Sequence, residues 1–227
     1  NGVQAFYDSP IDFPGLTQIS VTINAQDTSG NVLQKIYVFT TGTAPVAGPI
    51  AFNISHGPTI SYTTIIQAAV EASPNDTILV TPGVHIEAGT ITINVSLNIS
   101  SISGVSTNTA ISGADLHQVL VITNNAVVSI SQLTIQNGYL LSSNGDSTKF
   151  GGAGIFLASG SLALTQIRGV SNNMGDGAGG FLFAANGTTL NINNSYIADN
   201  HSGTAATTEG LGGALFSFAN ATISNTY

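Results

Sequence analysis

Side chains that could carry acid–base chemistry are few and scattered in this chain. The 227 residues include 3 Lys+Arg against 11 Asp+Glu, and the formal net charge is −8. Catalysis by carboxylates needs two acids that converge on one bond. The acids stand singly in separate segments, among them Glu87, Asp115, Asp146, Asp176 and Asp199. We therefore expect no catalytic site and interpret the protein as one that is not an enzyme.

The basic residues do not form a catalytic pair either. They are Lys35, Lys149 and Arg168, each far from the others in the sequence. Arg168 stands near the end of a predicted strand, among apolar and small neighbours. We expect its side chain to point outward and to pair with an acid on an adjacent repeat. A role in binding a ligand is the alternative.

Residues that could hold a metal ion are also dispersed. The four histidines, which lack the spacing of zinc ligands, are His56, His85, His117 and His201. Asp27 and Asn31 could offer oxygen atoms to calcium, and Asp176 stands in a glycine-rich turn. Plain turns explain all three residues better, because Asp and Asn favour such positions. We expect neither a metal nor a cofactor.

A repeated phrase indicates how the chain is built. The pattern apolar-x-apolar-x-amide occupies residues 128–132, 162–166, 190–194 and 221–225, with a degenerate copy at 97–101. Its last positions, 101, 132, 166, 194 and 225, are separated by 31, 34, 28 and 31 residues. A nearly constant period of this size is typical of repeat architectures, in which each copy packs only against its neighbours.

The pattern within each copy predicts strands. Apolar residues alternate at period two, and Gly or Asn clusters follow them. Glycine-rich segments at 151–154, 177–180 and 210–213 precede three of the copies, where glycine permits a sharp bend. Each repeat therefore holds at least two strands, and successive repeats can stack strand over strand at about 4.8 Å. In such a stack, Ile99, Ile130, Leu164, Ile192 and Ile223 should lie inside.

These features resemble right-handed parallel β-helix (pectin-lyase-like) proteins, particularly bacterial surface proteins with polymorphic-outer-membrane or adhesin-type repeats. The resemblance rests on the spacing, on the amide after each strand and on Gly212-Gly-Ala-Leu215, and it covers roughly residues 60–227. It implies an all-β solenoid with an internal ladder of stacked amides. The residues at the matching positions are Gln132, Gln166, Asn194 and Asn225. Surface amides in turns are the alternative.

One short helix is predicted before the first repeat, over residues 61–74. Ser61 or Thr63 can cap its first turn, and Pro74 stops it. Its apolar face consists of Ile66, Ala69 and Val70. Such a helix resembles the cap that closes many β-helix ends, where it covers the core and the edge backbone. A surface helix on a loop is the alternative.

The N-terminal region differs from the repeats. Segments 17–23 and 32–39 alternate like strands, and they look like the last hairpin of an immunoglobulin-like sandwich. We therefore predict two regions, an N-terminal strand segment with its linker at 1–47 and a parallel β-helix at 48–227. A two-stranded hairpin is marginally stable alone, so it must pack on something else.

The overall composition restricts the setting. So few basic residues cannot neutralise the phosphates of a nucleic acid. No apolar run approaches the length of about 20 residues that a membrane span needs. The chain has no cysteine, which rules out disulfides and thiolate metal sites but does not locate the protein. A repeat protein that is rich in Ser, Thr, Asn and Gly and poor in Lys has the composition of exported surface proteins, so we expect an extracellular or cell-surface location. Candidate glycosylation sites are Asn53, Asn75, Asn94, Asn98, Asn186, Asn193, Asn200 and Asn220.

The sequence thus favours a structural protein, either a surface adhesin or a subunit of a fibre or sheath that works by association. The last copy of the phrase ends without a cap, so we expect a longer natural chain or a neighbouring molecule to cover that end. Strand addition between copies would use Ile19, Val21, Ile23, Ile36, Val38, Ile223 and Tyr227. A cell-surface or carbohydrate ligand is the other expected partner. The alternative function is that of a carbohydrate-binding or polysaccharide-cleaving β-helix.

Overall fold

The computed structural model describes residues 18–26, 29–30, 32–40, 49–55, 58–141, 151–175, 177–203 and 210–227. The chain divides into two compact units, Asn1–Gly48 and Pro49–Tyr227. Several residues considered in the sequence analysis lie outside the described part of the chain, namely Asp27, Asn31, His56, Asp146, Lys149 and Asp176.

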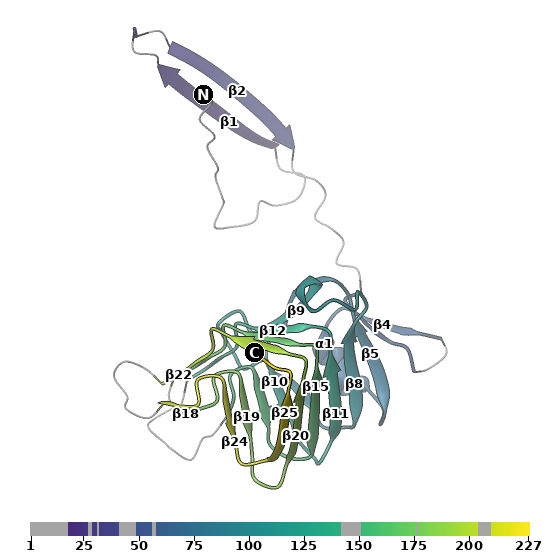
Figure 1. Cartoon of the computed structure of the whole chain (residues 1–227). Coiled ribbons are helices and arrows are strands. Elements are labelled where there is room, and N and C mark those ends of the chain that lie inside the picture. Colours follow the sequence, from purple (N-terminus) through teal and green to yellow (C-terminus); the bar gives the residue numbers. More distant parts are fainter. Residues whose placement is uncertain are drawn as a thin grey trace. The chain divides into compact units, whose positions relative to one another are not determined.

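The described part of the first unit is an antiparallel pair of strands, β1 (Gln18–Gln26) and β2 (Val32–Thr40). The pair forms as the alternating sequence predicts (Figure 1). The register places Ile19, Val21 and Ile23 opposite Phe39, Tyr37 and Lys35, whereas Ile36 and Val38 stand opposite Thr22 and Ser20. Among the five residues expected to contact another copy, Ile19, Val21 and Ile23 therefore belong to one alternating set of paired positions, and Ile36 and Val38 belong to the other.

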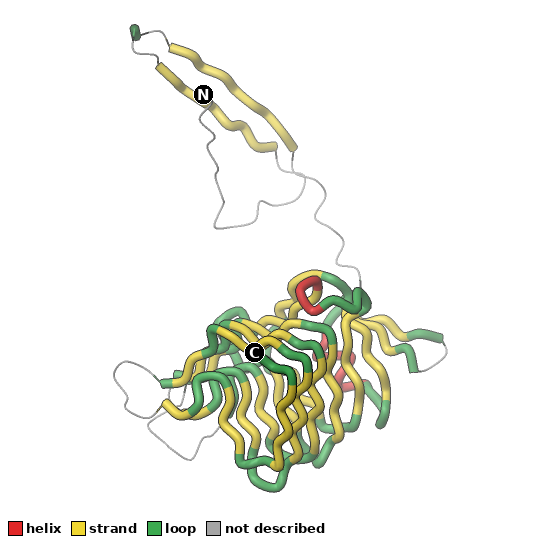
Figure 2. Tube along the Cα trace, in the orientation of Figure 1, coloured by secondary structure: helices red, strands yellow, loops and turns green. Residues whose placement is uncertain are grey.

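The second unit consists mostly of parallel β-sheet, which confirms the all-β prediction (Figures 1 and 2). Each circuit of the chain is here called a pass. From β7 to β21, every pass adds one strand to each of three sheets in turn. Sheet 1 contains β7 (Ile91–Ile93), β10 (Leu120–Ile122), β14 (Ile155–Leu157), β19 (Leu182–Ala184) and β24 (Leu215–Ser217). These strands follow one another in register, without slips.

Within a pass, sheet 1 is followed by sheet 2 and then by sheet 3. Sheet 2 contains β5 (Asp76–Val80), β8 (Leu97–Ser101), β11 (Val127–Ser131), β15 (Ser161–Thr165), β20 (Thr189–Asn193) and β25 (Asn220–Ser224), preceded by the antiparallel strands β4 (Ile60–Tyr62) and β3 (Ala51–Asn53). Sheet 3 contains β6 (Gly83–Ile86), β9 (Thr109–Ser112), β12 (Thr134–Gln136), β16 (Arg168–Val170) and β21 (Tyr196–Ala198).

Short strands lie in the connections between sheet 3 and the next strand of sheet 1. They are β13 (Tyr139–Leu140), β17 (Asn173–Met174) and β22 (His201–Ser202) in one group, and β18 (Gly177–Ala178) and β23 (Gly210–Leu211) in another. A one-turn 3-10 helix, η1 (Ser106–Asn108), interrupts the connection between β8 and β9.

The core is a set of side-chain columns that run along the stack. In sheet 2 the column Ile78, Ile99, Ile130, Leu164, Ile192 and Ile223 follows the strand register. The prediction that these residues lie inside is confirmed for Ile99, Ile130, Leu164 and Ile192, each of which is at most 1% exposed. It is wrong for Ile223, which is 50% exposed because no further described strand packs beyond β25.

Where a column lacks a side chain, a neighbouring residue fills the gap. Gly169 occupies the inner position of β16, between Ile135 and Ile197 in the register. A Cβ atom on Gly169 would lie 2.6 Å from the ring of Phe181, which is fully buried. Phe181 therefore takes the space that a larger residue would occupy, and the glycine is required for this packing.

The predicted helix is α1 (Ile65–Glu71), and its N-cap is Thr64, not Ser61 or Thr63. The Thr64 hydroxyl accepts from the Gln67 backbone N–H at 3.1 Å. The buried residues are Ile65, Ala68 and Ala69, so the predicted face is correct only for Ala69, and Val70 is 72% exposed. The buried face is thus shifted by one residue from the predicted one and keeps the same i, i+3, i+4 spacing.

Helix α1 takes the place of a sheet 1 strand in the first pass. It comes directly before β5 and β6, and it packs against β7, the first strand of sheet 1. The buried Glu87 carboxylate holds its N-terminus, accepting from the Ile65 and Ile66 backbone N–H groups at 2.8 and 3.1 Å. Among the described residues, no helix is long and apolar enough to cross a membrane.

Tyr62, at the end of β4, makes this first pass sensitive to alkaline pH. Burial, followed by the charges of Glu71 and Asp76, raises the pKa of the Tyr62 phenol above its ordinary value of 10.0. The folded protein therefore keeps a proton that the unfolded chain releases near pH 10. The stability from this group is complete below the unfolded pKa and is lost as the pH rises through the folded one.

We predict that Tyr62→Phe removes this part of the alkaline destabilisation, because phenylalanine cannot ionise. Urea midpoints measured at about pH 8 and about pH 11 should differ less for the variant than for the wild type. Tyr227→Phe, at a position that is 87% exposed, is the control and should behave as the wild type does. An equal loss of stability in the wild type and Tyr62→Phe would contradict the prediction.

Candidate functional site

Two bends recur along the stack and shape the outer surface of sheet 3. The first lies between sheets 2 and 3 and carries Gln132, Gln166, Asn194 and Asn225, whose φ angles are 58°, 54°, 50° and 46°. The second follows sheet 3 and carries Asn137, Ser171 and Asp199, with φ angles of 50°, 56° and 55°. Both bends thus use the left-handed backbone region, in which asparagine and aspartate are enriched.

The four amides of the first bend do not form the internal ladder that the resemblance implies. Gln166, Asn194 and Asn225 are exposed and Gln132 is half-buried, so the prediction of an internal position is wrong. A residue with positive φ turns its side chain out of the corner, and the next residue, Leu133, Ile167 or Ser195, enters the interior instead. One hydrogen bond joins the outer amides, from Gln132 Nε2 to Gln166 Oε1 at 3.3 Å.

The internal amide ladder lies at the second bend and consists of Asn172 and Asn200. Asn172 is fully buried, and its Oδ1 accepts from the Gly138 N–H at 2.9 Å. Its Nδ2 donates to Asn200 Oδ1 at 2.9 Å and to the Ile135 carbonyl at 3.2 Å. Asn200 continues the ladder by donating to the Gly169 carbonyl at 2.8 Å. These bonds tie three successive passes together.

A weak sequence signal marks this ladder. Asn172 and Asn200 are 28 residues apart, the same interval as Gln166 and Asn194, and each follows a small or acidic residue at the bend. The preceding pass has Gly138 at the equivalent position. Because only two copies carry the asparagine, the repeated outer amides dominate the pattern.

Arg168 and Tyr196 stand side by side on the outer face of sheet 3. They are partners in the β16–β21 register, and the Arg168 Cζ lies 4.6 Å from the centre of the Tyr196 ring. The expected ion pair with an acid on an adjacent repeat is not found among the described residues. Tyr227 extends the row, because its N–H donates to the Ser195 carbonyl and its carbonyl accepts from the Ile197 N–H.

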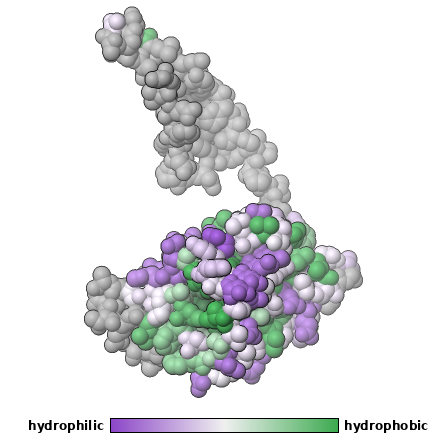
Figure 3. Space-filling model, viewed as in Figure 1, coloured by the Kyte–Doolittle hydropathy of each residue, from purple (hydrophilic) through white to green (hydrophobic). Residues whose placement is uncertain are grey.

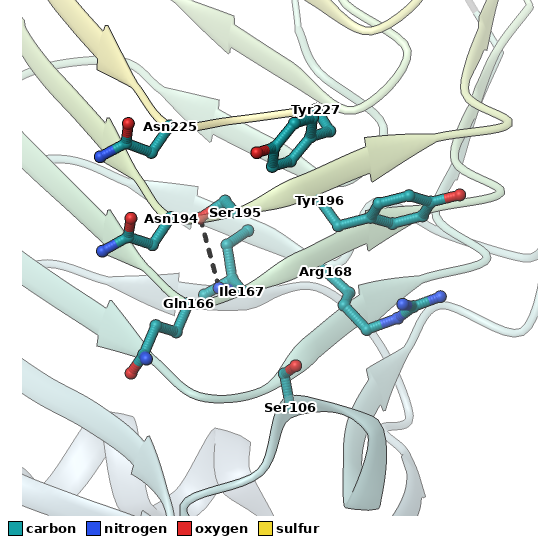
Figure 4. A pocket seen from close by; sticks show the side chains of 9 residues that line it. All are labelled: Ser106, Gln166, Ile167, Arg168, Asn194, Ser195, Tyr196, Asn225 and Tyr227. Atoms are coloured by element: carbon teal, nitrogen blue, oxygen red, sulfur yellow. Dashed lines mark hydrogen bonds between the residues drawn. The ribbon is translucent and has the colours of Figure 1, made fainter.

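A groove of about 570 Å³ runs along this row. Figure 4 shows Gln166, Asn194 and Asn225 in one column along it, with the backbone of Ile167 and Ser195 between this column and the second one. Arg168, Tyr196 and Tyr227 form the second column. Ser106 of η1 closes one end, where its carbonyl accepts from the Thr134 hydroxyl at 2.7 Å.

The groove is suited to recognition by hydrogen bonds and by charge. Its amides offer donors and acceptors, Tyr196 offers an aromatic face, and Arg168 offers a fork of N–H donors. In the described part of the chain, no group of three or more His, Asp or Glu residues could hold a metal ion. His85 and His117 instead face backbone carbonyls, with His85 Nε2 2.7 Å from the Thr81 oxygen and His117 Nδ1 2.9 Å from the Gln118 oxygen.

The candidate glycosylation sites fall into two groups. Asn53 is 1% exposed and donates to Asp76 Oδ2 at 2.6 Å, so the prediction of a glycan there is wrong. Asn200 belongs to the internal ladder, which occupies its amide nitrogen and contradicts that prediction as well. The sites that stay predictions are the exposed Asn75, Asn94, Asn98, Asn186 and Asn220 and the half-buried Asn193.

The chain matches no protein-family model, and neither a curated protein nor a solved structure is significantly similar to it.

We predict that Asn172→Ala destabilises the second unit by about 2–4 kcal/mol, because it leaves buried backbone groups without partners. Asn191→Ala is the matched control, since Asn191 is exposed on β20, and its effect should stay within about 0.5 kcal/mol. Chemical unfolding followed by circular dichroism measures both. Equal stability of the two variants would show that the ladder contributes nothing.

Proposed function

We propose that the second unit is a right-handed parallel β-helix and that the protein is an extracellular structural protein, either a surface adhesin or a subunit of a fibre or sheath. The register of sheet 2 supports the fold, since every strand from β5 to β25 pairs in parallel with the strand of the next pass. Crossovers between parallel strands of one sheet are right-handed in about 98% of cases, which supports the hand.

The observation that carries the structural role is the continuity of this stack. Main-chain pairing, buried aliphatic columns and the Asn172–Asn200 ladder each link one pass to the next, so the unit resists separation along its axis. We propose that the protein functions through this rigid form and through association, without catalysis.

Association by strand addition is supported at the last described pass. β24 and β25 each pair with a strand on one side, and no described strand pairs with the other side. Ile223 is 50% exposed there, and Figure 3 shows hydrophobic and hydrophilic residues side by side on one face of the second unit. We propose that another copy adds a strand here, such as one from β1–β2, because exposed apolar side chains at a strand edge favour strand addition.

We predict that the intact protein forms elongated assemblies and that Ile223→Asp shortens them, because a charge at the contact would be buried without a partner. Deletion of residues 1–40 should have the same effect if the hairpin supplies the added strand. Electron microscopy and light scattering measure the particle length. Leu116→Asp is the control, at a position 77% exposed outside β24 and β25. An intact protein that stays monomeric at high concentration would contradict the proposal.

A further inference from the structure

We propose that the outer face of sheet 3 is a second association surface, which pairs with the same face of a second copy about a two-fold axis. The surface, called the sheet 3 face, consists of Arg168, Val170, Tyr196, Ala198 and Asp199. It is distinct from the strand edges of β24 and β25.

The register sets the order of side chains on the sheet 3 face. Arg168 and Tyr196 begin neighbouring strands, and Val170 and Ala198 end them. Asp199 follows β21 at the second bend and is exposed. Three steps along an extended chain span about 10 Å, so Asp199 lies about that far along the strand direction from Tyr196. The face therefore has a basic end, a small apolar centre and an acidic end.

Among the described residues, no carboxylate forms an ion pair with Arg168. Arg168 is the one Lys or Arg among the described residues of the second unit, and its guanidinium lies over the Tyr196 ring without an ion pair among those residues. The protein has 11 Asp+Glu against 3 Lys+Arg, so a second copy brings exposed carboxylates that can pair with Arg168. Arginine and tyrosine are also the residue types that dominate binding energy in protein interfaces.

A two-fold axis along the stacking direction makes the sheet 3 face self-complementary. This axis makes the sheet 3 strands of the two copies run antiparallel across the contact. The first residue of each strand therefore lies opposite the residue that follows the same strand in the partner. Arg168 of each copy then faces the second bend of the other copy, where Ser171 lies opposite and Asp199 lies one pass, about 4.8 Å, further along the stack, within reach of the long arginine side chain. The small side chains of Val170 and Ala198 lie near the centre of the contact. The convex second bend enters the groove beside Tyr196, where the outer amides can bond to its backbone.

The test uses charge reversal in the full-length chain. In this arrangement Arg168→Asp and Asp199→Arg each create two repulsive pairs, so either variant alone should lose at least about tenfold in association constant. A 1:1 mixture of the two variants pairs opposite charges at both contacts and should associate as the wild type does. The double variant Arg168→Asp/Asp199→Arg, which keeps the wild-type net charge, should do the same.

Sedimentation velocity over a range of protein and salt concentrations measures all four samples, and circular dichroism checks that each variant is folded. Glu71→Arg is the control, because it makes the same charge change as Asp199→Arg on an exposed residue of α1. Ile223→Asp tests strand addition at β25 and should not change the outcome of the charge-reversal experiment. Failure of one proposed interface can therefore be distinguished from failure of the other. A mixture that associates no better than its components would overturn the proposal, as would loss of binding to an acidic oligosaccharide in Arg168→Asp without any change in association.

Discussion

Main-chain hydrogen bonding between successive passes is the constraint on which the rest of the structure depends. A parallel neighbour must present its strand in register about 4.8 Å away, so each pass has to bend at the same places as the one before. The chain meets this requirement with residues at positive φ, such as Gln166 and Asn194 at the first bend and Ser171 and Asp199 at the second. The lengths of the passes differ, and the connections between strands absorb the difference.

This constraint separates two kinds of position. Inside, each side chain contacts the equivalent residue of the next pass, which favours columns of Ile and Leu and leaves room for one amide ladder at Asn172 and Asn200. Outside, a side chain has neighbours only along its row, so residue types are less restricted. The pairing of Arg168 with Tyr196 lies in such a row, and it is there that recognition of another molecule could evolve without disturbing the core.

The sequence predicts the strands and the columns because their period is imposed by the backbone and repeats in every pass. It predicts the amide ladder at the wrong bend. A periodic amide marks a bend with positive φ, but the pattern alone does not say whether the amide side chain faces the interior or the solvent. The N-terminus of α1 is held by the contact between Glu87 and the Ile65 N–H, which no local pattern contains. The groove depends on the proximity of η1, β16 and β21, segments that only the stacked fold brings together.

The most direct test of the account is a pair of engineered disulfides, made possible by the absence of native cysteine. Ser129 and Ala163 are register partners on the outer side of β11 and β15. Adjacent strands place such Cα atoms about 4.8 Å apart, within the range that a disulfide bridges, whereas a shift of two residues exceeds about 7 Å. The account predicts that Ser129→Cys/Ala163→Cys cross-links quantitatively on mild oxidation and that Ser129→Cys/Thr165→Cys does not. Equal cross-linking of both pairs, or none in the first, would contradict the stacked parallel register.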